Sequence, residues 1–150
     1  MKRFDFPLEK VRQWRNEQAG LEEMKLQRIY SELRAIDEGR KRVEEELAEA
    51  SRQVRGRLVP EVVDLVNLDT FRLFTASRLL QIEDAWRKCQ AQVEQQRQHL
   101  VEARRRFELL DKLKQTALAN WRVARDKEEE ELAGELFLAK RRREHRTSES

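Results

Sequence analysis

Few residues of this sequence have the type and spacing that catalysis or metal binding requires. A nucleophilic cysteine needs an exposed, electropositive environment. The single cysteine, Cys89, instead falls at an apolar helical position that favours a small buried thiol. The two histidines, His99 and His145, are far apart and are not spaced with other ligands as a metal site requires. The acidic runs at 44–46 and 128–131 are typical of exposed helix faces, where no cavity desolvates them. We therefore expect no catalytic residue, no metal site, no cofactor and no enzymatic activity.

The composition favours long helices over a compact globular core. Of the 150 residues, 41% are charged and 39% hydrophobic, and only 4 are glycine and 2 are proline. Several short strands would need many more turn residues, whereas long helices need few. The glycines are scattered, so the sequence contains no glycine-rich loop that could hold a phosphate. We expect one all-α domain.

The charges are nearly balanced and interleaved along the chain. The 32 Lys and Arg residues are offset by 29 Asp and Glu residues, which leaves a net charge of +3. This pattern is typical of a solvated, ion-paired surface, so nucleic acid is not the expected partner. No apolar stretch approaches the roughly 20 residues of a membrane span, and no apolar signal region follows the first residues. Together with the low cysteine content, these features predict a cytoplasmic protein.

Apolar residues recur at steps of three and four in two long stretches, which is the pattern of a coiled-coil seam. In the first stretch eight of nine seam positions are apolar: Leu26, Ile29, Leu33, Ile36, Arg40, Val43, Leu47, Ala50 and Val54. A similar stripe lies upstream and joins it through a five-residue step: Leu8, Val11, Trp14, Gln18 and Leu21. Gly56 and Pro60 then stop the pattern. We predict a first helix over about residues 6–55.

The second stretch is longer and keeps the same step without a break. Its seam positions are Ile82, Trp86, Cys89, Val93, Gln96, Leu100, Ala103, Phe107, Leu110, Lys114, Ala117, Trp121 and Ala124. Between the stretches, residues 57–68 are rich in β-branched side chains and low in charge, and we expect them to form a hairpin tip. Asn67 or Asp69 could cap the following helix. The prediction is a second helix over about 69–143 and a disordered tail over 144–150.

Two long helices joined by a short linker can pair only antiparallel within one chain. The expected fold is therefore a long two-helix antiparallel coiled-coil hairpin. Folding at the middle of the predicted tip places Ile36 opposite Cys89 and Leu8 opposite Ala117. Residues beyond about Trp121 then have no partner in the first helix and are expected to overhang as a single helix.

Residues at the two ends of this hairpin are candidates for binding other proteins. At the tip, the apolar residues either fold back over one another or form a docking patch. The candidates there are Val62, Leu65, Phe71 and Phe74. Trp14 and Trp121 lie near the open end, where they are candidate interface anchors, although Trp121 also occupies a seam position. In the predicted overhang the candidates are Phe137, Arg141 and Arg142. The basic run 140–143 either contacts a phosphate or an acidic protein, or favours the helix dipole.

The first residues, Phe4-Asp5-Phe6-Pro7-Leu8-Glu9-Lys10-Val11, followed by Arg15, Glu17 and Leu21, resemble the start of the FliJ family of flagellar type III export proteins. The distinguishing part is the Phe-x-Phe-x-Leu-Glu start. The length, the two helices, the longer second helix and the charged tail are also similar to this family.

The resemblance implies an antiparallel coiled coil similar to the γ stalk subunit of rotary ATP synthases. It also implies three partners: the export ATPase ring, the large cytoplasmic domain of the export gate, and export chaperones. By position, Phe71 and Phe74 fall where gate contacts are expected, and 4–14 and 121–143 fall where ATPase contacts are expected. Such a protein would serve motility and chemotaxis, peripheral to the inner face of the cell membrane. The alternatives are an injectisome stalk protein and a structural coiled-coil tether.

Overall fold

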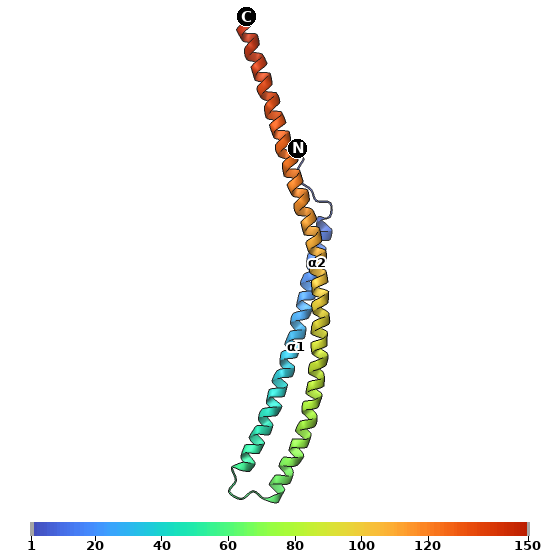
Figure 1. Cartoon of the computed structure of the whole chain (residues 1–150), viewed down its shortest axis with the longest axis vertical. Coiled ribbons are helices and arrows are strands. Elements are labelled where there is room, and N and C mark those ends of the chain that lie inside the picture. The colour runs from blue at the N-terminus through green and yellow to red at the C-terminus, as the bar shows by residue number, and fades with distance from the viewer. Residues whose placement is uncertain (1, 150) are drawn as a thin grey trace. The chain divides into compact units, whose positions relative to one another are not determined.

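The computed structural model describes residues 2–149 and consists of two helices, with no strand in this range. Helix α1 is Glu9–Arg55, with 47 residues, and helix α2 is Val62–Glu149, with 88 residues. The chain turns back on itself between them, so that α2 runs antiparallel to α1 (Figure 1). The expected all-α fold, an antiparallel coiled-coil hairpin of two long helices, is confirmed.

The contacts divide the chain into two units, which are described separately. The hairpin unit comprises Gln18–Ala103 and contains the tip. The terminal unit comprises the residues up to Glu17 together with those from Arg104 onward.

The core of the hairpin unit is the seam between α1 and α2. Leu26 of α1 packs with Val93 and Leu100 of α2, and Ile29, Tyr30 and Leu33 pack around them. Val93 is 2% exposed and Val43 is 3% exposed, which makes them among the most buried apolar residues. In α2, each predicted seam position from Ile82 to Ala103 is buried or half-buried, as the step of three and four requires. In α1, the predicted seam position Arg40 is exposed, because its long charged side chain turns outward and pairs with Asp37.

Helix α2 begins seven residues before the predicted start at residue 69, so the linker between the helices covers only 56–61. The carboxylate of Asp64 accepts a hydrogen bond from the backbone N–H of Glu61 at 3.2 Å and pairs with Arg57. This is half of a capping box, and it supplies the cap that the sequence predicts at Asn67 or Asp69. β-Branched residues cost only a few tenths of a kcal/mol each in a helix, so the cap and the burial of Leu68 suffice to keep 62–68 helical.

In the hairpin unit, the earlier start of α2 shifts the pairing of the two helices by one heptad. The Cys89 sulfur lies 3.6 Å from the carbonyl oxygen of Ile29, whereas the predicted tip placed Cys89 opposite Ile36. Ile36 instead lines a groove with Ile82 and Trp86. Because seven residues are two helical turns, the shift keeps the same residues in the seam and changes only which ones meet.

In the terminal unit, the chain before α1 lies against α2. The Phe6 carbonyl accepts a hydrogen bond from the N–H of Glu9 at 3.1 Å, and α1 therefore begins at Glu9 rather than at residue 6. The Phe4 ring packs edge-on against Trp121, with ring centroids 6.0 Å apart. The indole N–H of Trp121 donates a hydrogen bond to the carbonyl of Lys2 at 3.2 Å.

The predicted upstream seam is wrong in the terminal unit. Leu8, Val11 and Trp14 are 42%, 42% and 49% exposed. Arg12 and Glu9 are half-buried instead and reach the side chains of α2. Arg12 and Glu9 form ion pairs with Asp111 and Lys114 of α2. Because this face of α1 lies against α2, the neighbouring apolar stripe is turned away from α2.

Helix α2 continues to Glu149, so the segment predicted to be a disordered tail is helical as far as it is described, and Ser150 lies outside the described residues. Every residue from Asp126 to Glu149 is exposed. This segment, residues 126–149, is called the overhang below. Its existence as a single helix agrees with the expectation for residues beyond Trp121.

Candidate interaction surfaces

Cys89 lies in the core of the hairpin unit, where it is 5% exposed. Burial raises the pKa of its thiol, and nearby Glu32 raises it further. The thiol is therefore protonated at neutral pH and donates a hydrogen bond to the Ile29 carbonyl. The arrangement is that of an inert core cysteine.

The histidines do not converge with other ligand residues. His99 is exposed, and His145 lies 3.6 Å from Glu149 at the end of the overhang. Within residues 2–149, no group of three or more His, Cys, Asp or Glu side chains is arranged to hold a metal ion. None of the described helices is long and apolar enough to cross a membrane.

The hairpin tip carries a dense set of exposed apolar side chains, which we call the tip surface. Of the two readings left open by the sequence, the structure excludes a tip folded over its own residues. The exposed fractions range from 50% at Leu65 to 103% at Leu58, and the set consists of Leu58, Val59, Val62, Val63, Leu65, Val66, Leu73 and Phe74. Phe71 is half-buried, so it belongs partly to the seam, whereas Phe74 is 61% exposed. Apolar side chains gathered in this way are typical of a protein-binding surface.

The second candidate surface lies in the terminal unit, where the chain before α1 meets α2. Its central residue is Trp121 of α2. It is half-buried beneath Phe4, and the Arg125 guanidinium lies 5.1 Å from the centroid of its ring. These contacts fix the indole in one orientation. Trp121 therefore holds the N-terminal segment onto α2 and acts first within the chain, not as a free anchor for a partner.

Trp14 is the freer of the two predicted tryptophan anchors. It is 49% exposed, and the guanidinium of Arg15 lies 4.8 Å from its ring centroid. With Val11 of α1 and Leu8, which lies directly before α1, it forms an exposed apolar stripe, because these residues follow one another at steps of three.

A group of ion pairs joins α1 to α2 beneath this stripe. Arg12 contacts the Asp111 carboxylate at 2.9 Å and also lies 5.3 Å from the centroid of the Phe107 ring. Lys114 contacts Glu9 at 2.9 Å. The hydrogen bond from Lys114 lowers the pKa of Glu9, with burial opposing and the charges of Lys114 and Arg12 adding to the effect. Sequence analysis assigned Lys114 to the seam but did not find its partner, because the predicted alignment placed Lys114 opposite Val11 rather than Glu9.

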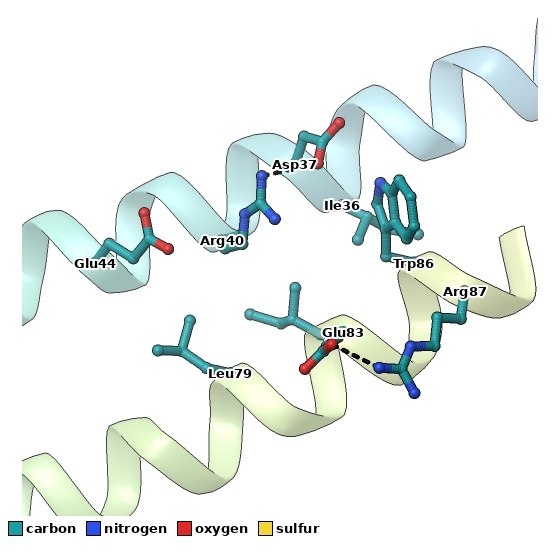
Figure 2. A pocket seen from close by; sticks show the side chains of 9 residues that line it. Ile36, Asp37, Arg40, Glu44, Leu79, Glu83, Trp86 and Arg87 are labelled. Atoms are coloured by element: carbon teal, nitrogen blue, oxygen red, sulfur yellow. Dashed lines mark hydrogen bonds and ion pairs between the residues drawn. The ribbon is translucent and has the colours of Figure 1, made fainter. Parts of the chain in front are cut away.

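Figure 2 shows the groove between the helices in the hairpin unit. Ile36 and Trp86 lie at one end of it, and Leu79 lies farther along α2. The charged residues pair along their own helices, Arg40 with Asp37 at 3.5 Å and Arg87 with Glu83 at 2.8 Å. Arg40 lines the groove without filling its seam position, because its guanidinium pairs with Asp37.

The overhang presents the remaining predicted residues, Phe137, Arg141 and Arg142, all of them exposed. Phe137 is 65% exposed, and Leu132, Leu136 and Leu138 are 57%, 64% and 53% exposed. The acidic run 128–131 precedes these apolar residues and the basic run 140–143 follows them. Both runs lie on the same solvent-surrounded helix.

The chain matches no protein-family model, and no curated protein or solved structure is significantly similar to it.

Proposed function

We propose that this chain is the coiled-coil adaptor of a flagellar type III export apparatus. In this proposal its terminal unit binds the export ATPase ring, and the tip surface binds the cytoplasmic domain of the export gate. It thereby assists the delivery of chaperones and their substrates. Such a protein works in the cytoplasm, at the inner face of the cell membrane.

The observation that carries the proposal is the overhang, which belongs to the same unit as the Phe-x-Phe-x-Leu-Glu start. Exposed apolar and charged residues on a single helix suit insertion between the subunits of a larger assembly, because such a helix offers side chains on every face. The tip surface supports a second binding site in the other unit, as an adaptor requires. Neither surface needs a catalytic group.

The ATPase arm of the proposal is tested by adding the purified chain to the export ATPase of the same organism. We expect the rate of ATP hydrolysis to rise, and the double variant Leu136→Ala, Phe137→Ala to reduce the rise, because alanine keeps the helix and removes the exposed apolar side chains. The matched control is Leu80→Ala, Val101→Ala, which removes similarly exposed side chains from the hairpin unit. An ATPase rate that the unaltered chain does not change would contradict the proposal.

The gate arm is tested by binding of the purified chain to the isolated gate domain. We expect Leu65→Ala, Phe74→Ala to weaken binding while leaving the ATPase effect intact. The overhang variant, Leu136→Ala, Phe137→Ala, should reduce the ATPase effect while leaving binding to the gate domain intact. One variant that abolishes both effects equally would indicate loss of structure rather than two surfaces, so circular dichroism of each variant accompanies the measurement.

Motility separates the proposed function from its alternatives. A strain that lacks the gene should be non-motile, and the unaltered gene should restore swimming. A motile deletion strain would instead favour an injectisome stalk protein or a structural tether.

A further inference from the structure

The overhang is a helix whose apolar residues no other described part of the chain covers. Its residues from Asp126 to Glu149 are all exposed, although the segment contains three leucines and a phenylalanine in its middle. In proteins, most of the stability of a helix comes from packing of an amphipathic face rather than from helix propensity. A partner that covers one face would therefore stabilise the helix as well as the contact.

One face of the overhang carries its own short seam. Glu129, Leu132, Leu136, Ala139 and Arg143 follow one another at steps of three, four, three and four. The seam is apolar in the middle, acidic at its N-terminal end and basic at its C-terminal end. The flanking residues repeat this order, with acid over 128–131 and base over 140–143.

This order is self-complementary only in the antiparallel direction. If two overhangs cross at Leu136, Glu129 of one copy lies opposite Arg143 of the other, and the same contact recurs on the other side of the two-fold axis. Leu132 then lies within one residue of the position opposite Ala139, so that a large side chain packs beside a small one. A parallel pair would place Glu129 against Glu129 and Arg143 against Arg143, which like-charge repulsion disfavours.

We propose that the overhang is a homodimerisation site, at which residues 126–149 of two copies of this chain pair antiparallel about Leu136. The pairing brings both acidic runs against both basic runs and covers the exposed leucines. It does not depend on the proposed export role, although it would cover the segment that this role assigns to the ATPase.

The pairing is expected to be weak and sensitive to salt. The charges lie at the surface of the helix, where salt screens them over a Debye length of about 8 Å at physiological ionic strength. Sedimentation of the full chain should therefore show a monomer and dimer in exchange, with the dimer favoured at high protein concentration and low salt. A monomer under all these conditions would overturn the proposal.

Charge reversal tests the complementarity. In one variant the acidic run is changed by Glu128→Lys, Glu129→Lys, Glu130→Lys and Glu131→Lys; in the other the basic run is changed by Lys140→Glu, Arg141→Glu, Arg142→Glu and Arg143→Glu. Each variant alone should dimerise at least about tenfold more weakly, since several ion pairs of a few tenths of a kcal/mol are replaced by repulsions. An equimolar mixture of the two should recover dimerisation. Failure of the mixture to recover, with both variants still helical by circular dichroism, would contradict the charge pairing.

A spin label at the end of the overhang tests the direction. In a Cys89→Ser background, Ser148→Cys carries the label. Antiparallel pairing about Leu136 separates the two labels along the helix axis by roughly 36 Å, at 1.5 Å per residue, whereas parallel pairing brings them close together. A short distance between the labels would overturn the proposal. None of these three measurements involves the export ATPase, so failure here and failure of the proposed function are distinguishable.

Discussion

The sulfur of Cys89 lies 3.6 Å from the carbonyl oxygen of Ile29, a contact that fixes how the two helices of the hairpin unit align. Leu26, three residues before Ile29, packs against Val93, four residues after Cys89. The two contacts belong to the same antiparallel alignment, which differs by one heptad from the alignment with Ile36 opposite Cys89.

A disulfide tests this alignment. Ile29→Cys should form an intramolecular disulfide with Cys89 under mild oxidation, because the two positions face each other across the seam. Ile36→Cys, about 10 Å farther along α1, should not, since a disulfide requires Cα atoms within about 7 Å. Mass spectrometry of the dilute, oxidised proteins measures the loss of both thiols. Closure in the Ile36→Cys variant and not in the Ile29→Cys variant would show that the alignment is wrong.

The packing of the seam predicts a contrast between two valines of α2. Val93 is 2% exposed, and Val93→Ala should lower the free energy of unfolding by about 2 kcal/mol through lost burial and the cavity left behind. Val101 is 60% exposed, and Val101→Ala should change it by less than about 0.5 kcal/mol. Urea unfolding followed by circular dichroism measures the free energy of unfolding of the two variants. Equal effects would mean that Val93 is not in the core.

Gly39 is a position at which the hairpin unit can be stabilised. It lies within α1, and an added Cβ would meet no atom within 4 Å. Gly39→Ala should therefore raise the free energy of unfolding by about 1 kcal/mol. Gly56→Ala serves as control: it lies outside α1, and its Cβ would come 3.3 Å from the backbone oxygen of Arg52. The midpoint of thermal unfolding should rise for the first variant and not for the second.

The ion pair between Glu9 and Lys114 makes the stability of the terminal unit depend on pH. Lys114 holds the pKa of Glu9 below its usual value in the folded protein. The stabilisation is thus fully present above the pKa of the unfolded carboxyl, and it is lost as the pH falls through the lower folded pKa. Glu9→Gln should lower the melting temperature at pH 7 in low salt.

In the same experiment, the difference in melting temperature between Glu9→Gln and the unaltered chain should disappear in acid. Glu94→Gln, which removes an exposed charge from the hairpin unit, controls for the change in net charge. If the difference in melting temperature persists unchanged below the pKa of Glu9 in the folded protein, the ion pair does not cause that difference.

The sequence was sufficient to predict the fold and most of the seam because these depend on periodicity. From Ile82 to Trp121 every predicted seam residue of α2 is buried or half-buried. The start of α2 was missed because the valines after Pro60 have low helix propensity, and nothing local showed that Asp64 would cap Glu61. The alignment of the helices in the hairpin unit followed from that start and was missed with it.

The exposure of Leu8, Val11 and Trp14 could not be predicted from the same pattern. An apolar stripe at helical spacing reads as a seam whether or not the partner helix lies against it. Which face of α1 lies against α2 depended on the contact between Arg12 and Asp111, which are 99 residues apart in the sequence. Of the candidate binding residues, Phe74, Val62, Leu65, Trp14, Phe137, Arg141 and Arg142 are exposed, whereas Phe71 and Trp121 are half-buried.

The contact between Trp121 and Lys2 spans 119 residues, which has a consequence for biosynthesis. Next to the six-residue linker the two helices can associate as soon as they leave the ribosome, since few residues separate the groups that meet there. The N-terminal segment is made first but meets Trp121 only when most of the polypeptide has been translated. Until then Phe4 and the exposed stripe at Trp14 are accessible to chaperones that bind nascent chains.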